Sequence, residues 1–580
     1  MKEVEIHTER IDDIPLLFHQ QQRMGIAETI DEVVTVHGNR QGLSLGRMLS
    51  VWISYILSEA DHRMSEVETW AAEQMESLSA LLRGSVCEKD FTDDRLADGL
   101  RLLGNDEYWA EIEQRLSSRL IGVYDLKRSP VRLDSTTVAV YHDTEENTLF
   151  RHGHSKDHRP DLAQFKIMLA TLDPLGMPVA TLVVPGNESD DPLYIPAIRE
   201  ARPVVGQGGC LYVGDAKMGA LGTRAFVQAS GDYYLMPLAR TGKVPELLQE
   251  LLQPVWEKKQ PVERIYAPDA EGLESKEKKR KIVALAYEAT RLQQADVEEQ
   301  TLSWQERVLV VYSPSLAQRA RRGLAERLER AEKALLALTP PPGRGKRQWE
   351  DLDSLQQAAQ AIVKKRRVQG LLQIGYHKEV DQRTIRKYGD RPARTEEQVR
   401  YVIEVDRDQA AIHAARRQMG WRLYVNNAPR EILPLEQAIW AYRGASHIER
   451  NFGRFKGRPL GIRPLYVRRE DHALGMVRVL SLALRVLTVV EHVVRQQLLN
   501  TGEALSGLYA GNPKRKTARP TTERLLRAFR GITLTIVQLP NQTIRHITPL
   551  SDLQQRILAL LGLSGSIYEN LALSVHPIPP

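Results

Sequence analysis

The hydrophobic pattern of the chain changes near Val131, and the order of segments that follows limits the fold more than any other feature. Residues 131–141 alternate in polarity and are rich in β-branched side chains, which predicts a strand. After it we predict two strands, a helix, a strand, a helix and a strand, at 164–173, 177–186, 190–201, 210–214, 219–230 and 233–238. Strands interleaved with helices in this way indicate a mixed α/β layer.

The 580 residues are too many for one hydrophobic core, and the pattern divides them into regions. Apolar residues recur at helical spacing from the start of the chain to about residue 125. Between about residues 240 and 427, strand-like segments surround two charged helical segments, which predicts an inserted β-rich domain with a helical hairpin. The predicted regions are a helical N-terminal region at 1–125, an α/β core in two parts at 126–239 and 428–500, the inserted domain at 240–427, and a basic C-terminal region at 501–580.

Charge, cysteine content and hydropathy narrow the class of protein. The net charge of +6 permits a polyanionic partner without identifying one. Cys87 and Cys210 provide neither a disulfide framework nor a zinc-ligand spacing, and they fit a reducing cytosol. The most apolar stretch, 476–490, is too short to span a bilayer. We therefore expect a buried helix at about 473–498, a cytoplasmic protein and no membrane partner.

Two aspartates stand out because each lies in or at the end of a predicted strand. Asp134 falls inside the β-branched strand, where a charge is costly unless it is paired or binds a metal ion. Asp215 ends a short apolar strand, the usual place for functional groups in α/β sheets. Either residue alone could instead cap a turn or pair with an arginine.

A third carboxylate, Glu449, lies between Tyr442 and Lys456 at a spacing of seven residues. We predict one helix from about residue 435 to 456, and seven residues are just under two helical turns, so the three side chains would share one stripe. Two strand carboxylates and a helix carboxylate make an all-oxygen site suited to Mg²⁺ or Mn²⁺. Two such ions could polarise a phosphodiester and activate a water or a 3′-hydroxyl.

The segments around these acids resemble the catalytic blocks of bacterial insertion-sequence DDE transposases. They are LDST around Asp134, VGDAKM around Asp215 and YRGASHIERNFGRFKGRPL around Glu449. HGHSKDHRPDLAQFKIML at 152–169 and PGNESD at 185–190 are similar to a subgroup of the branch that has a Tyr-Arg-Glu-Lys signature and an inserted β-rich domain. The blocks occur in the family's order between about residues 30 and 530.

This resemblance implies a ribonuclease H-like catalytic core, interrupted by the inserted domain. It implies that Asp134, Asp215 and Glu449 are the catalytic metal ligands, for Mg²⁺ or Mn²⁺ and with two ions bound. The signature arginine, three residues after the tyrosine, is replaced here by Ala445. Arg450 or Arg454 could supply its charge.

Several other residues are candidates for contact with DNA. The resemblance implies that Lys456 contacts a phosphate near the cleaved end and that Tyr442 lies near the terminal nucleotide; a solvated lysine and a core tyrosine are the structural alternatives. Lys156, His158 and Arg159 form a basic loop that could follow a phosphate backbone or could be a solvated hairpin. Lys217 could contact DNA or neutralise the acids.

The expected function is a DNA transposase that binds its terminal inverted repeats, cleaves the element ends and joins the 3′-hydroxyls to target DNA. The N-terminal helical region would bind end DNA, and a homodimer would pair the two ends near the nucleoid. Two alternatives remain: a structure-selective nuclease, and a domesticated DNA-binding protein on the same fold.

Overall fold

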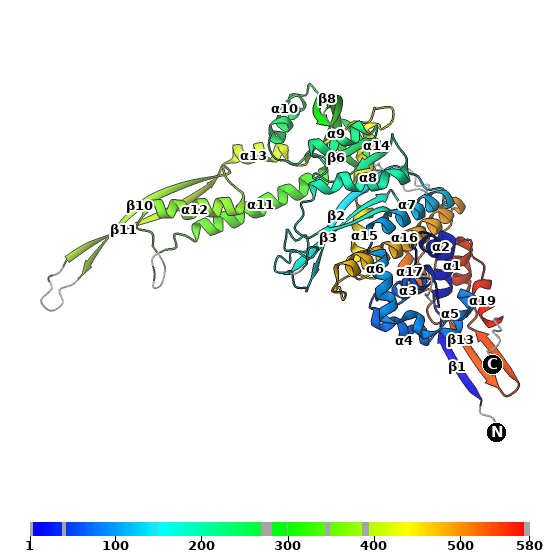
Figure 1. Cartoon of the computed structure of the whole chain (residues 1–580). Coiled ribbons are helices and arrows are strands. Elements are labelled where there is room, and N and C mark those ends of the chain that lie inside the picture. The colour runs from blue at the N-terminus through cyan, green and yellow to red at the C-terminus, as the bar shows by residue number, and fades with distance from the viewer. Residues whose placement is uncertain are drawn as a thin grey trace. The chain divides into compact units, whose positions relative to one another are not determined.

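The computed structural model describes residues 4–36, 42–145, 147–267, 281–297, 300–341, 343, 348–385, 392 and 394–573. The chain forms two compact units. The first consists of residues 1–239, 290–307 and 425–580, and the second of residues 240–289 and 308–424. Figure 1 shows the course of the chain with its helices and strands labelled.

The N-terminal part of the first unit is helical, as predicted. Side-chain oxygens of Ser44 and Asn105 cap the helices α3 and α7 by accepting hydrogen bonds from the backbone N–H groups of their first turns. The apolar faces of the helices are buried, and Trp52 at the centre of α3 is completely enclosed. The helices are α1 (Ile14–Met24), α2 (Ile26–Val33), α3 (Leu45–Glu59), α4 (Val67–Ala72), α5 (Met75–Leu82), α6 (Asp93–Leu103) and α7 (Asp106–Val123), with 3-10 turns at Met64–Glu66 and Glu88–Phe91.

The sheet of the first unit contains the strands predicted after Val131. The order of these strands is β4, β3, β2, β5, β6. The pairs β2–β3 and β3–β4 are antiparallel, whereas β2–β5 and β5–β6 are parallel, so the sheet is mixed. Its strands are β2 (Val131–Val140), β3 (Ala163–Leu172), β4 (Met177–Pro185), β5 (Leu211–Val213) and β6 (Tyr233–Pro237).

Helices before and after these strands pack on the sheet. α8 contacts β3 and β4, α9 contacts β6, and α15 contacts β2. The helix predicted at 190–201 is present as a 3-10 turn at Asp191–Leu193 followed by α8, and the one predicted at 219–230 is α9. The bounds are α8 (Tyr194–Val205), α9 (Leu221–Ala229), α14 (Leu435–Arg443) and α15 (Ser446–Lys456).

The apolar stretch near the C-terminal third forms α16 (Glu470–Thr501), the central helix of the first unit. Among the described residues it is the one helix long and apolar enough to cross a membrane, yet 94% of its most apolar stretch is buried inside the protein. Two of its arginines are buried against α6 and α7: Arg478 donates to the carbonyl of Leu103, the last residue of α6, at 2.7 Å, and Arg485 donates to Glu113 of α7. These contacts are those of the buried helix expected from the sequence.

The two ends of the chain meet in a small antiparallel sheet of the order β1-β13-β14. β1 pairs with β13 from Glu5↔Gln538 to Arg10↔Thr533. This pairing was not predicted, because the sequence of β1, EIHTER, has no alternation of apolar and polar residues. In the structure almost all of its side chains are exposed. The elements are β1 (Glu5–Arg10), α17 (Thr522–Arg527), β13 (Thr533–Leu539), β14 (Gln542–Ile547), α18 (Asp552–Leu560) and α19 (Ser566–Leu573).

The second unit combines a helix pair with a long antiparallel strand pair. β10 and β11 pair along their full length, from Leu372↔Arg407 to Ile385↔Arg394, and α11 packs on α12 and β11. β8, β9 and β12 have residues in both units. The elements are α10 (Val244–Trp256), β7 (Glu263–Tyr266), β8 (Ile282–Val297), β9 (Gln300–Tyr312), α11 (Pro314–Leu336), α12 (Leu352–Arg366), β10 (Leu372–Ile385), β11 (Arg394–Arg407), α13 (Gln409–Gln418) and β12 (Trp421–Asn426).

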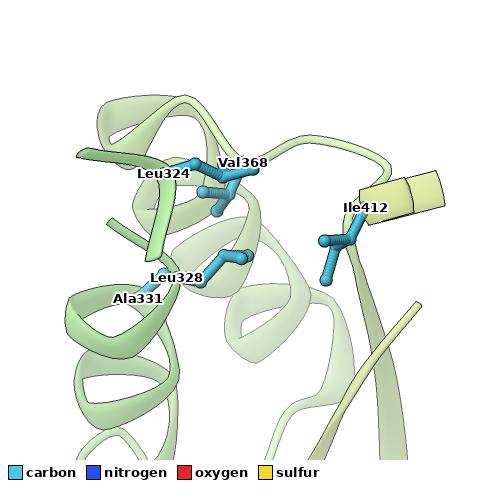
Figure 2. Packing of buried hydrophobic residues seen from close by; sticks show 5 residues of the cluster. All are labelled: Leu324, Leu328, Ala331, Val368 and Ile412. Carbon is cyan, nitrogen blue, oxygen red and sulfur yellow. The ribbon is translucent and has the colours of Figure 1, made fainter. Parts of the chain in front are cut away.

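The second unit has apolar clusters of its own. Figure 2 shows one of them, in which side chains of α11 lie toward Val368 and Ile412. Leu324, Leu328 and Ala331 recur on α11 at the spacing of one helical face, so this face is buried although the helix is rich in charge. A second cluster joins α11 and α12 to Ile403 of β11.

Candidate active site

Asp134 and Asp215 lie on neighbouring parallel strands at matching positions. Arg132 of β2 and Val213 of β5 are register partners. Each aspartate follows its partner by two residues, so both continue in the same direction from the paired positions. Adjacent strands are about 4.8 Å apart. The fold therefore brings the two predicted acids to one place on the sheet.

Asp134 is mostly buried and lies among other charged groups. Burial, with smaller contributions from the charges of Asp215 and Asp190, raises the pKa of Asp134 to about 6, although the charge of the Lys156 ammonium opposes this shift. Its Oδ1 accepts a hydrogen bond from the Ser135 backbone N–H at 2.8 Å. A desolvated carboxylate crowded by other acids gains from a bound cation.

Asp215 is oriented by two donors that end on the same oxygen. The Tyr194 hydroxyl donates to Asp215 Oδ1 at 2.6 Å, and the Lys217 backbone N–H donates to it at 2.8 Å. Tyr194 begins α8 and is buried, and burial raises the pKa of its phenol well above the ordinary value, so it stays a donor. The sequence does not mark Tyr194, because an aromatic residue at the start of a helix is usually part of a core.

A lysine and a third aspartate complete the surroundings of Asp134. Lys156 donates to the Ser135 carbonyl at 2.7 Å and lies 3.2 Å from Asp190. Lys166 of β3 lies 2.8 Å from the other oxygen of Asp190. Although burial opposes the shift, the Lys166 hydrogen bond and the Lys156 charge hold the pKa of Asp190 below its ordinary value. Lys156 is thus an internal cation of this cluster.

Glu449 lies on a helix that is shorter than predicted. The single helix expected from residue 435 to 456 is wrong: α14 ends at Arg443, and α15 begins at Ser446. Tyr442 is half-buried near the end of α14, whereas Glu449 is exposed in the first turn of α15. Glu449 and Lys456 therefore lie on the same helix, as predicted, whereas Tyr442 lies on the helix before it.

The break between the two helices coincides with a contact from the sheet. Arg132, two residues before Asp134, donates to the carbonyls of Ala441 and Tyr442. In a continuous helix these carbonyls would accept from the N–H groups four residues later. Arg132 also forms a buried ion pair with Asp173, with Nη2–Oδ2 at 2.5 Å. A Cβ added at Gly444, the residue after α14, would lie 2.8 Å from Arg132 Nη2, so any other residue here would require this guanidinium to shift.

The three predicted ligands are not gathered into one set. Among the residues that the structure describes, no three Asp, Glu, His or Cys side chains are arranged to hold a metal ion. Asp134 and Asp215 fit a divalent cation by position and by their oxygen donors. Glu449 is exposed, on a helix that packs on β2. Its part as third ligand stays a prediction.

Lys456 has a protein partner. Its ammonium lies 2.7 Å from Asp157, whose other oxygen lies 3.0 Å from Arg463. Burial lowers the pKa of Lys456, although Asp157 opposes the shift. Asp157 belongs to the predicted basic loop, so this loop is tied to the end of α15.

The two other predicted basic contacts lie at the surface. Arg159 is exposed and pairs with Asp161 at 2.7 Å. The Lys217 ammonium is exposed, 3.4 Å from Asp191, while its backbone N–H serves Asp215.

Neither proposed substitute for the signature arginine faces the aspartates. Arg450 and Arg454 both lie against Glu491 of α16, at 2.8 and 2.6 Å, and Arg454 also pairs with Glu523. Arg132 of the sheet does contact this junction, where it donates to the Ala441 carbonyl.

Comparison with known proteins identifies the family of the chain. Residues 126–485, more than half of the chain, match the family described as "Transposase DDE domain". No curated protein matches the chain. A solved structure described as "Cryo-EM structure of piggyBac transposase synaptic complex with hairpin DNA" is 8% identical, with a TM-score of 0.32, over 99% of this chain and 89% of that one. A TM-score this low carries no argument. By the match over residues 126–485, the chain belongs to the transposases with a DDE domain.

Proposed function

We propose that the chain cleaves the ends of its own DNA element and joins the 3′-hydroxyls to target DNA. The observation that carries this proposal is the parallel register of Asp134 and Asp215 within the matched transposase domain. Both steps are in-line phosphoryl transfers, so one acidic site can serve both. The element would be a bacterial insertion sequence of the branch with a Tyr-Arg-Glu-Lys signature.

The proposed core is ribonuclease H-like and interrupted by the segment 240–427. Three consecutive antiparallel strands followed by two parallel strands support this proposal, because they place the two acid-bearing strands next to each other.

Asp134, Asp215 and Glu449 would hold two Mg²⁺ or Mn²⁺ ions. When bound, such ions polarise the phosphodiester and make a water or a 3′-hydroxyl a better nucleophile. Tyr194 and the Lys217 N–H hold Asp215 in one orientation. Lys156 offsets the negative charge that Asp134 and Asp190 bring together. Glu449 would complete the set from the first turn of α15, the helix that packs on β2.

The proposed partners are the terminal inverted repeats and the target DNA. Lys456 would contact a phosphate near the cleaved end, in exchange for its present partner Asp157. Arg159 and Lys217 are exposed and could reach a backbone, and Tyr442 would lie near the terminal nucleotide. Two ends must be joined together, so a homodimer on DNA, in the cytoplasm near the nucleoid, is part of the proposal.

A strand-transfer assay separates this proposal from a nuclease. The terminal repeats can be read from the DNA that flanks the gene, and the protein is then incubated with pre-cleaved ends, a target plasmid and Mg²⁺. We expect plasmid molecules joined to the element ends. Hydrolysis without joined product would favour a structure-selective nuclease, and binding without cleavage in Mg²⁺ or Mn²⁺ would favour a domesticated DNA-binding protein.

A further inference from the structure

Residues 501–530 carry a positive charge that their own carboxylates do not offset. The segment has seven lysines and arginines but only two acids, Glu503 and Glu523. Glu503 pairs with Arg556, and Glu523 pairs with Arg454, so both acids serve arginines outside the segment. Like charges held this close repel each other. A surface of this kind is stabilised by a polyanion.

Two of these arginines are held on one aromatic ring. The guanidinium carbons of Arg515 and Arg524 lie 4.1 and 4.2 Å from the centre of the Tyr509 ring. We call these three residues the Tyr509 platform. A cation over a ring is held by the ring's electron density, so its N–H donors are not used up. Both guanidinium groups can still donate to phosphate oxygens.

The backbone around the Tyr509 platform is fixed before any ligand arrives. Leu505 and Thr517 exchange two backbone hydrogen bonds of 2.9 Å, and Gly507 donates to the Pro513 carbonyl at 2.9 Å. The start of α17 is tied to α16, because the Thr522 hydroxyl donates to the Leu487 carbonyl at 2.6 Å. An anion that binds here meets groups that are already ordered, which lowers the entropy cost of binding.

The Tyr509 platform is also linked to the helix that carries Glu449. Glu523, next to Arg524 in α17, pairs with Arg454 of α15 at 2.7 Å. Arg454 and its second partner, Glu491, are buried. DNA held at the platform would therefore be held by an element that is tied to the catalytic helix.

We propose that the Tyr509 platform binds successive phosphates on the backbone of duplex DNA. Because both guanidinium carbons lie close to the same ring centre, the distance between them cannot exceed the sum of their two distances to that centre. Two arginines this close together can contact neighbouring phosphates of one strand. The ring itself is occupied by the arginines, which disfavours stacking of an unpaired base. This inference rests on the proposed function, since it concerns the same DNA partner.

The test measures duplex binding by the full chain at several salt concentrations, with a DNA of arbitrary sequence. For Arg515→Gln/Arg524→Gln we expect weaker binding and a slope of log K against log salt that is shallower by about 1 per arginine. Arg322→Gln/Arg330→Gln is the matched control, because these exposed arginines both lie within 4.0 Å of Glu326 on their own helix, α11. Tyr509→Leu should weaken binding without any change of charge, whereas Tyr509→Phe should bind as the unmodified chain does.

The outcomes separate the inference from the function on which it rests. An unchanged salt slope in the platform variant, or an equal decrease in the control variant, would overturn the inference while leaving the proposed function in place. If the platform variant loses binding to a single strand of the same sequence, titrated alongside, but keeps duplex binding, the inference is also overturned. If the unmodified chain binds no duplex DNA, both proposals fail. Unfolding midpoints of all variants show whether each one is folded.

Discussion

The Tyr194 hydroxyl donates a hydrogen bond of 2.6 Å to Oδ1 of Asp215. This contact orients Asp215, a candidate metal ligand that lies just beyond the end of strand β5. β5 ends at Val213, so no ladder hydrogen bond holds residue 215. The buried phenol replaces that restraint. Residues that orient a metal ligand from behind are commonly worth about 10–100-fold in metal affinity or activity.

Tyr194→Phe removes this hydrogen bond while keeping the ring in the core. We expect cleavage to fall about 10–100-fold at limiting Mg²⁺ and to recover in part at higher Mg²⁺. Cleavage rates over a range of Mg²⁺ concentrations measure both effects. Tyr212→Phe, in the neighbouring strand β5 and equally buried, is the control and should leave the metal dependence unchanged. Identical metal curves for Tyr194→Phe and the unmodified chain would remove Tyr194 from this role.

The three carboxylates should be needed for chemistry but not for binding. Asp134→Asn, Asp215→Asn and Glu449→Gln should each reduce cleavage by more than about 100-fold, because a direct ligand matters more than the groups that orient it. End binding, measured without metal, should remain near that of the unmodified chain. The Glu449 variant is the most informative, since Glu449 is exposed in the structure. Near-normal cleavage by Glu449→Gln would leave Asp134 and Asp215 to act without it.

The elements with strong periodicity could be predicted from the sequence. β2, β3 and β4 lie within one residue of their predicted bounds, because β2 alternates in polarity and all three strands are rich in apolar and β-branched residues. The position of Asp215 just after a buried strand could be predicted for the same reason. The parallel register that brings it beside Asp134 is a long-range property and comes only from the fold.

Contacts between distant segments account for what could not be predicted. The helical pattern of the sequence continues through residues 435–456, yet the helix breaks between α14 and α15. Arg132, more than 300 residues earlier, donates hydrogen bonds to two backbone carbonyls at this break. Lys456 has the sequence context of a solvated or DNA-binding lysine, but Asp157 of a distant loop pairs with it. Neither partner could be identified from local propensity, because each depends on tertiary structure.

Variants of Lys456 test whether this lysine leaves Asp157 to contact a DNA phosphate. Lys456→Ala should weaken end binding and make the salt slope shallower by about 1, because one phosphate contact is lost. Lys456→Arg keeps the charge and should keep the slope. Binding titrations of end DNA at several salt concentrations measure this. A slope that stays the same in Lys456→Ala would mean that the lysine contacts only Asp157.

Asp13 should make the stability of the first unit depend on pH. It precedes α1, is 5% exposed, and accepts a hydrogen bond from Ser58 at 2.6 Å. Burial raises its pKa to about 7, with smaller contributions from the charges of Asp12 and Glu59. An unfolded aspartate titrates near pH 4, at about 3.9. Between about pH 4 and pH 7 the folded chain keeps a proton that the unfolded chain has released, so the stabilisation is present below this range and is lost as pH rises through it.

Asp13→Asn cannot ionise and should lack this dependence. Relative to the unmodified chain, the free energy of unfolding of the variant should rise by about 1.4 kcal/mol per pH unit between roughly pH 5 and pH 7. Urea unfolding followed across this range measures the difference. Asp98→Asn, which removes an exposed carboxylate of α6, is the control. Its free energy of unfolding should change with pH in the same way as that of the unmodified chain. If Asp13→Asn also runs parallel to the unmodified chain, then Asp13 is ionised in the fold and its burial must be compensated by a cation.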